Sequence, residues 1–307
     1  MRTSNHRESI RATREQTLTD LLKQIRLELR IAYRFVRSDL WTTIYPGAAV
    51  SVSALLHASA INAAEVERLL VAIVQICLLF YGVALSEQWR AEEEDRLNKP
   101  WRPLAAGMVT LSQLRIRCFA IWLTILLLTY ALGTIWWAVA VLTVSLLHAH
   151  LGLSRQWWAK SVLPPLALLS MMAAQWQAMA PMSFEIWRWG AWMLGMTVMT
   201  IAVQDLRDLD GDRAVGRRTF PMVFGESFAR VLFAIAFVSL LLPEFLLMRV
   251  SRHTPPQVDV CFIVSVLLSL ILAWRVINRH GRAEDHRTYR VWEYWFAAMF
   301  VSMGFCI

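Results

Sequence analysis

Nine apolar stretches fill most of this 307-residue chain, and each is close to the roughly 20 residues that a helix needs to cross a bilayer. The hydrophobic share of 57% and the mean hydropathy of +0.44 are too high for an ordinary soluble domain. The sequence therefore predicts an all-α, polytopic membrane protein with about nine transmembrane helices. The stretches cover approximately residues 40–61, 67–86, 114–132, 134–150, 161–180, 187–204, 227–247, 257–274 and 291–307.

The basic residues support this number of spans, because loops on the cytosolic side of a membrane carry most of the Lys and Arg. With a cytosolic amino terminus, 27 of the 31 Lys and Arg residues fall on the cytosolic side. The third and fourth stretches are separated only by Gly133 and Thr134, and merging them would move the basic 205–230 loop to the other side. We therefore expect the carboxyl terminus on the opposite side. The exceptions are Arg68, Arg188, Arg249 and Arg252.

The net charge of +8 follows this topology. It therefore indicates a lipid bilayer as the partner and no nucleic acid. Residues 1–38 are expected to form a cytosolic basic tail with an amphipathic interfacial helix from Thr17 to about Arg37. A flexible tail is the alternative for residues 1–16. The helical pattern depends on Leu18, Leu21, Leu22, Ile25 and Leu29, with Lys23, Arg26 and Arg30 between them.

A polar stretch after the sixth apolar run carries Asp205, Asp208 and Asp212 at positions i, i+3 and i+7. If the preceding helix continues, these carboxylates share one face. Hard oxygen ligands of this kind suit Mg²⁺, which is usually shared between one or two carboxylates and a substrate phosphate. The alternative is a solvated acidic loop that pairs with neighbouring arginines, which are Arg207, Arg213, Arg217 and Arg218.

A second polar stretch, residues 87–107, follows the second apolar run and ends with Pro100 and Pro103. On a continuing helix Glu94 and Asp95 point inward, while Glu92 and Glu93 point more to water. The same face would hold Glu87, Gln88 and Ala91. Taken alone, such an acidic run is more often a solvated helix face.

Together the two stretches resemble the two signature regions of the UbiA superfamily of intramembrane prenyltransferases. The second signature is matched at Asp205, Asp208, Gly211, Asp212, Arg213, Gly216, Thr219, Pro221 and Gly225. The first is matched at Asp95, Asn98, Lys99, Pro100, Arg102, Pro103 and Gly107. The chain departs from the first signature at Glu87-Gln88, where the family has Asn-Asp, and at Ala91, where it has the middle Asp.

This resemblance implies that residues 39–307 form a UbiA-like transmembrane domain with its helices around a central cavity. It also implies an isoprenoid diphosphate substrate and Mg²⁺ as cofactor. The expected metal ligands are Asp95, Asp205, Asp208 and Asp212, which with Glu94 form the expected catalytic set. The expected diphosphate-binding residues are Lys160, Arg102, Arg213, Lys99 and Gln88. His148 and His150 are candidate general bases or interfacial polar residues.

The acceptor of the prenyl cation decides between functions. The eroded first signature resembles the branch of UbiA-type terpene cyclases, and we therefore expect a cyclase. The alternatives are prenyl transfer to an aromatic or lipid acceptor and non-catalytic isoprenoid binding or transport. Aromatic rings can stabilise a cation, and Trp41, Tyr81 and Trp176 are the side chains we expect to face the cavity.

Overall fold

The computed structural model describes residues 2–57, 61–250 and 256–306, and the side chains of 17–57, 61–249 and 257–305. Arg252, one of the four basic residues outside the predicted cytosolic side, lies outside the described residues. In the described part the chain consists of helices joined by turns and loops, and it has no β-strand. The predicted all-α fold is therefore confirmed.

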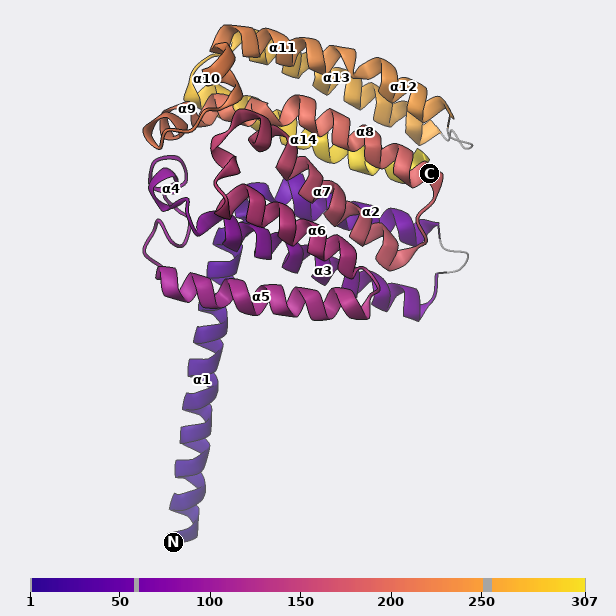
Figure 1. Cartoon of the computed structure of the whole chain (residues 1–307). Helices are drawn as coiled ribbons and strands as arrows, with labels where there is room; N and C mark the ends of the chain where they lie inside the picture. Colours follow the sequence, from indigo (N-terminus) through magenta and orange to yellow (C-terminus); the bar gives the residue numbers. More distant parts are fainter. Residues whose placement is uncertain (1, 58–60, 251–255, 307) are drawn as a thin grey trace.

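The long helices run side by side, and α1 projects out of this bundle (Figure 1). The helices are α1 (Arg2–Val36), α2 (Tyr45–Leu56), α3 (Ala63–Gln88), α4 (Glu92–Asn98), α5 (Leu111–Ala131), α6 (Ile135–Ser145), α7 (Trp157–Met179), α8 (Phe184–Thr200), α9 (Asp205–Ala214), α10 (Phe220–Phe224), α11 (Glu226–Ser239), α12 (Leu241–Val250), α13 (Pro256–Asn278) and α14 (Arg282–Cys306).

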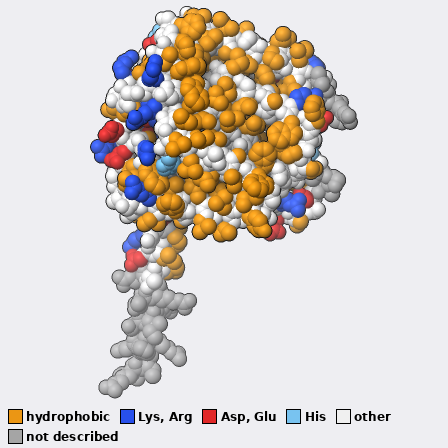
Figure 2. Space-filling model, viewed as in Figure 1, with side chains coloured by type: hydrophobic (Ala, Val, Ile, Leu, Met, Phe, Trp, Pro, Cys, Tyr) orange, Lys and Arg blue, Asp and Glu red, His pale blue; other side chains and the backbone are white. Residues whose placement is uncertain are grey.

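The short helices α4, α9 and α10 gather at one end of the bundle, which we call the charged end (Figure 1). Figure 2 shows Lys, Arg, Asp and Glu side chains clustered there and a broad band of hydrophobic side chains over the long helices. A contiguous apolar surface of this kind fits hydrocarbon rather than water. The bundle therefore presents the surface of a multi-pass membrane protein.

Each of the nine predicted stretches coincides with one helix or with two consecutive helical segments. Within the described residues, four helical stretches are long and apolar enough to cross a membrane by length and composition. The number of nine spans therefore stays a prediction. The four stretches are Ala63–Gln88, Leu111–Ala131, Glu226–Arg249 and Gln257–Asn278, and Ile135–His150 is a shorter apolar stretch.

Local sequence signals explain where several helices begin and end. Asn62 caps α3 by accepting hydrogen bonds from the backbone N–H groups of Ala64 and Glu65. The predicted break between the third and fourth stretches is present, because Gly133 adopts a φ of 70° between α5 and α6. A positive φ costs glycine little, so the chain can reverse there.

The helix α1 begins at Arg2, well before the predicted start at Thr17. Only its last turns pack on the bundle, where Ile31 and Phe35 are buried. The apolar stripe before them is exposed and includes Leu18 and Leu22. The stripe thus lies on a part of the helix that extends beyond the bundle (Figure 1).

Candidate active site

A cavity of about 790 Å³ opens at the charged end and extends between the long helices. Its mouth is lined by side chains of both charges and its deeper wall by apolar and aromatic ones. The charged and ionisable lining residues include Glu87, Glu94, Lys99, Arg102, His148, Lys160, Asp208 and Arg217. The deeper lining includes Phe80, Val83, Met171, Trp292 and Phe296.

The helix α9 places Asp205, Asp208 and Asp212 on one side of the mouth. Asp208 lines the cavity and lies 3.4 Å from the Arg207 guanidinium. Asp205 and Asp212 lie behind the cavity wall and are almost completely buried. Lys160 from α7 stands between them, with its Nζ 2.8 Å from Asp205 and 2.9 Å from Asp212. The lysine therefore neutralises two carboxylates that would otherwise repel each other in a buried place.

The helix α4 supplies the opposite side of the mouth. Its buried Asp95 accepts two hydrogen bonds from Nη1 of Arg102, at 2.8 and 3.1 Å. Arg217 joins the two sides, because its guanidinium lies 2.6 Å from Glu94 on α4 and 3.3 Å from Asp212 on α9. These ion pairs hold the two acidic helices together across the mouth.

The close approach of α4 and α9 depends on Gly211. A Cβ at this position would lie only 2.2 Å from Nδ2 of Asn98 on α4. Any other residue would therefore force the Asn98 side chain or the two helices to shift. This contact gives a physical reason for glycine within the second acidic stretch.

Burial and charge move the pKa values of these carboxyl groups in different directions. Burial raises the pKa of Asp205 to about 6, although Lys160 opposes the shift. Burial also raises the pKa of Glu94, with Arg217 acting against it. For Asp208 burial is outweighed by Arg207, Lys99 and Lys160, which lower its pKa. Asp208 therefore stays ionised to a lower pH than Asp205.

Within the described residues, no three carboxylate, histidine or cysteine side chains are grouped as a ready-made metal site. Basic side chains separate the acidic ones. The donor set nevertheless suits Mg²⁺, since hard carboxylate oxygens converge from α4 and α9. Oδ1 of Asp205 is buried, and it lies 2.8 Å from the Lys160 ammonium. The residues fit a divalent cation bound near the place that the Lys160 ammonium occupies.

Two predicted diphosphate-binding residues do not lie at the cavity. Gln88 is buried, and its Nε2 donates a hydrogen bond to the Phe35 carbonyl at 3.2 Å. The predicted continuous helix is wrong here, because α3 ends at Gln88 and α4 begins at Glu92. Consequently the residues from Glu87 to Asp95 do not share one helix face.

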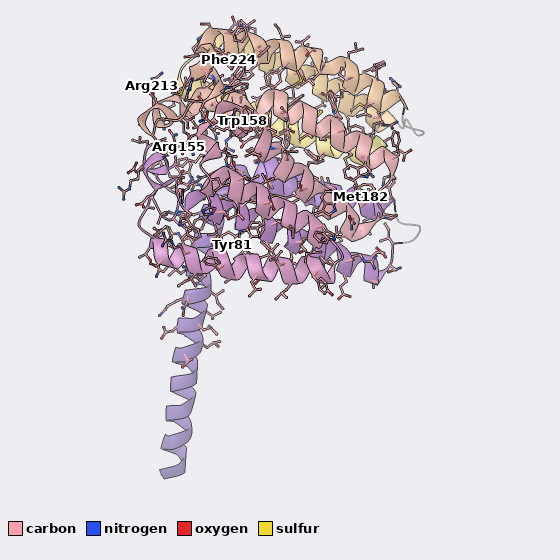
Figure 3. The ribbon with its side chains drawn as sticks, in the orientation of Figure 1. Tyr81, Arg155, Trp158, Met182, Arg213 and Phe224 are labelled. Atoms are coloured by element: carbon pink, nitrogen blue, oxygen red, sulfur yellow. The ribbon has the colours of Figure 1, made fainter. Side chains whose placement is uncertain are left out.

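Arg213 is the second correction. Its side chain is 68% exposed and lies 3.9 Å from Asp210, and it is labelled at the outer edge of α9 in Figure 3. The helix ends at Ala214, and Gly216 with a φ of 69° reverses the chain. This reversal brings Arg217 into the mouth instead. Glycine after the acidic run was the sequence signal for the turn.

The remaining predicted residues are brought together. Glu94, Asp208, Lys99, Arg102 and Lys160 all line the cavity. The predicted difference among the acidic side chains of α4 stays a prediction, because Glu92, Glu93 and Glu94 all line the cavity. Glu93 is exposed, and Glu94 is paired with Arg217. The buried members of the predicted set are Asp95, Asp205 and Asp212.

The two candidate histidines differ in position. Nδ1 of His148 lies 3.5 Å from Glu87, and both side chains line the cavity. The ring of His150 packs against Trp89, with 4.9 Å between the ring centroids. His150 is therefore an interfacial aromatic contact, and His148 is the histidine that faces the site.

The aromatic wall of the cavity comes from α14. Tyr289, Trp292 and Phe296 line the cavity one turn apart, and neighbouring ring centroids lie 5.3 and 5.1 Å apart. The expected positions of Trp41 and Tyr81 are wrong, since neither lines this cavity. Trp41 is 40% exposed, and Tyr81 packs edge-on against Phe35. The spacing of 289, 292 and 296 in the last apolar run was a sequence signal for this wall.

Known proteins with similar sequences cover nearly the whole chain. Residues 41–303 match the model of the UbiA prenyltransferase family. A relative in Streptomyces somaliensis, named somaliensene A/B synthase, is 34% identical over 88% of this chain and 90% of its own length. Two relatives in Hericium erinaceus are each 29% identical. The diterpene cyclase eriG matches 91% of this chain and 88% of its own length, and the polyprenyl transferase eriF matches 89% and 93%.

Solved structures show the same fold at low sequence identity. A UbiA homologue from Archaeoglobus fulgidus, solved with DMAPP and Mg²⁺, superposes with a TM-score of 0.63 at 12% identity. The match covers 89% of this chain and 98% of that one. At such identity the likeness concerns the fold alone.

Proposed function

Because the chain belongs to the UbiA prenyltransferase family, we propose that it uses Mg²⁺ to ionise an isoprenoid diphosphate and then cyclises the cation to a terpene. The observation that carries this proposal is the construction of one cavity from two chemically different halves. A charged mouth with Asp208, Glu94, Lys160 and Arg217 opens directly onto an aromatic and aliphatic wall. An isoprenoid diphosphate has the same two halves.

At the mouth, the basic side chains bind the diphosphate and neutralise its charge. Lys99, Lys160 and Arg217 line this region, and fixed positive charges aimed at a leaving group stabilise the transition state of its departure. Asp208 and Glu94 are the cavity-lining carboxylates that would hold Mg²⁺, with the buried Asp95, Asp205 and Asp212 beside them. When bound, Mg²⁺ adds a Lewis acid that makes the diphosphate a better leaving group.

In the deeper cavity, the allylic cation lies next to the rings of α14. Trp292 and Phe296 present π faces or edges to this space, and a cation near an aromatic face is stabilised by about 2 kcal/mol when water is excluded. The distal double bonds of the same chain are tethered nucleophiles. Tethering favours their attack through a high effective molarity. Ring closure moves the positive charge onto the cyclic product, which then loses a proton to give a hydrocarbon, or captures water and loses a proton to give an alcohol.

Two features favour cyclisation over transfer to a second substrate. Ala91 and Gln88 replace carboxylates of the family pattern, so the first acidic region has fewer metal ligands than in the pattern. Two of the relatives are themselves named as a terpene synthase and a diterpene cyclase.

Prenyl transfer is the second candidate function. It is supported by the family itself and by the polyprenyl transferase relative, which is as similar to this chain as the diterpene cyclase is. Binding without catalysis is less well supported, because a carrier has no use for a mouth with opposed acidic and basic groups.

The experiment that tests the proposal uses the full chain in lipid nanodiscs. Farnesyl or geranylgeranyl diphosphate is supplied with Mg²⁺, with and without a phenolic acceptor, and diphosphate and organic products are measured. Cyclic hydrocarbon or alcohol without an acceptor is expected. Product that forms only with the acceptor would establish transfer instead, and no diphosphate release in either case would leave only binding. An Asp208→Asn variant is the control, because diphosphate that it still releases does not depend on the carboxylate at the cavity mouth.

A further inference from the structure

A second pocket continues the main cavity away from the charged end. It has a volume of about 40 Å³ and lies between α2, α7, α8 and α14. Pro165, Leu168 and Thr197 line both spaces. Figure 3 labels Met182, which lines this second space, at the end of the bundle opposite to Arg155 and Arg213. We call it the distal pocket, and it extends the apolar part of the site.

One side of α14 runs along both spaces. Tyr289, Trp292 and Phe296 face the main cavity, and Phe300 and Met303 face the distal pocket. The rings of Phe296 and Phe300 lie 5.0 Å apart, so the aromatic wall has no break between the two spaces. From Tyr289 to Met303 this wall is about 21 Å long at a helical rise of 1.5 Å per residue.

The lining of the distal pocket excludes polar ligands. None of its lining side chains is charged, and Thr197 is its one hydroxyl group, which already donates to the Met193 carbonyl at 2.6 Å. Unpaired polar groups are costly in such surroundings. The ligand that suits the pocket is therefore a hydrocarbon group.

The far side of the pocket includes a rigid side chain, Trp176. Its indole Nε1 donates to the Pro181 carbonyl at 3.1 Å, and its ring lies 5.7 Å from the ring of His57. Only 3% of its surface is exposed. Neighbouring Met172 and Met193 are flexible side chains that adapt to the shape of a ligand, whereas the indole is held in place. Trp176 thus limits how far a ligand can extend.

We propose that the distal pocket receives the terminal methyl groups of the longest substrate that the protein accepts, and that Trp176 determines this upper length. The inference rests on the proposed function, since it assigns a length limit to the same isoprenoid diphosphate. Trp176 acts here as a specificity-determining residue and has no part in diphosphate release.

The test compares geranyl, farnesyl, geranylgeranyl and geranylfarnesyl diphosphates under single-turnover conditions with Mg²⁺. We compare kcat/KM for the longest substrate that wild-type protein accepts with kcat/KM for the next longer one. Trp176→Ala should shift this ratio by at least about tenfold in favour of the longer substrate, because the pocket gains room for several methylene groups. Ala173→Leu fills the same pocket from α7 and should shift the ratio the other way. Trp136→Ala, which removes an indole that is 79% exposed, is the matched control.

Ala173→Leu keeps the inference testable if Trp176→Ala does not fold, which size-exclusion chromatography in detergent would reveal. Unchanged length ratios in a folded Ala173→Leu or Trp176→Ala protein would overturn the inference. Geranyl diphosphate separates this failure from a failure of the proposed function. If all folded variants release diphosphate from geranyl diphosphate while the kcat/KM ratios between substrate lengths stay unchanged, the proposed ionisation is supported and the distal pocket has another role. If wild-type protein releases no diphosphate from any substrate, the proposed function itself fails.

Discussion

The ammonium nitrogen of Lys160 lies 2.8 Å from the carboxylate of Asp205, inside the wall of a cavity that opens at the charged end. The same nitrogen is 2.9 Å from Asp212. One ammonium group is thus shared by two buried carboxylates. A metal ion would compete with this ammonium for the carboxylates, and a diphosphate would compete with the carboxylates for the ammonium. Removing any member of this group changes both the charge balance and the ligand set of the site.

We therefore expect Asp205→Ala and Asp208→Ala to lower diphosphate release by at least about a hundredfold, the scale typical of lost electrostatic stabilisation of a transition state. Asp95→Ala should come close to this loss. Asp210→Ala is the matched control, because its carboxylate is 78% exposed on the same helix. Release is measured at saturating Mg²⁺, with protein yield in the membrane followed in parallel. Turnover that persists in EDTA or in the Asp205 variant would contradict metal-assisted ionisation.

The raised pKa of Asp205 predicts a pH dependence of metal binding. Its pKa of about 6 lies above the ordinary 3.8, so the folded protein holds this proton up to a higher pH than the unfolded chain. This group alone therefore makes the metal-free protein less stable as the pH rises from 3.8 to 6. Mg²⁺ needs the ionised form, and its apparent affinity should fall as the pH drops below about 6.

Proton release measures this linkage without any turnover. Mg²⁺ is added to weakly buffered protein at about pH 5.5 with an indicator dye, and wild-type protein should release more protons than Asp205→Asn. Equal release by the two proteins, or an apparent Mg²⁺ affinity that is the same at about pH 5.5 and about pH 7.5, would show that Asp205 does not bind the metal.

Within the acidic run of α4, alanine at Glu94 should reduce activity more than alanine at Glu92 or Glu93. Glu94 is ion-paired with Arg217, which also contacts Asp212, while Glu92 pairs with the surface residue Arg96. All three side chains line the cavity, but only the loss of Glu94 frees Arg217 from its ion pair with α4. Initial rates at limiting Mg²⁺ compare the three variants, and equal losses would mean that the run acts only through its total charge.

Much of this site follows from the sequence, and the errors have two physical causes. The apolar stretches and the two acidic regions locate the bundle and its charged end correctly, because length and charge spacing are local properties. Gln88 and Arg213 were misplaced because a helix was extended through a turn in one case and an outward-facing position was taken as inward in the other. Arg217 enters the mouth only after the reversal at Gly216, which depends on tertiary packing.

The topology remains a prediction with a direct test. The charged end carries the loops that hold most of the Lys and Arg, so we expect it in the cytosol with the amino terminus. The helix α1 projects out of the bundle there (Figure 1) and exposes Leu18, Leu22 and Leu29, as a helix lying on an anionic leaflet would. Epitope tags at the two termini should be accessible from opposite sides of sealed vesicles. Accessibility from the same side would rule out nine spans.

The aromatic wall of α14 gives the prediction that depends most on the structure. Trp292 and Phe296 line the cavity, and their ring centroids lie 5.1 Å apart. A cation formed at the mouth would pass both rings on its way into the deeper cavity. Leucine has no π face to stabilise positive charge, but it keeps the wall apolar. In Trp292→Leu and Phe296→Leu, we expect diphosphate release within about thirtyfold of wild type, since a stabilisation of about 2 kcal/mol is lost. We also expect a changed product mixture.

Trp41→Leu provides the comparison, because that ring is 40% exposed and packs against Tyr45 and Tyr294 away from the cavity. Products from one isoprenoid diphosphate are separated by gas chromatography, and diphosphate release is measured on the same samples. The cyclase proposal requires the product ratio to change in the α14 variants while the Trp41 variant keeps the wild-type ratio. If the α14 variants lose release and product in parallel and keep the same ratio, the rings serve only to pack the bundle. If the α14 rings guide the cation, their substitution changes the ratio of cyclic products more strongly than the rate of diphosphate release.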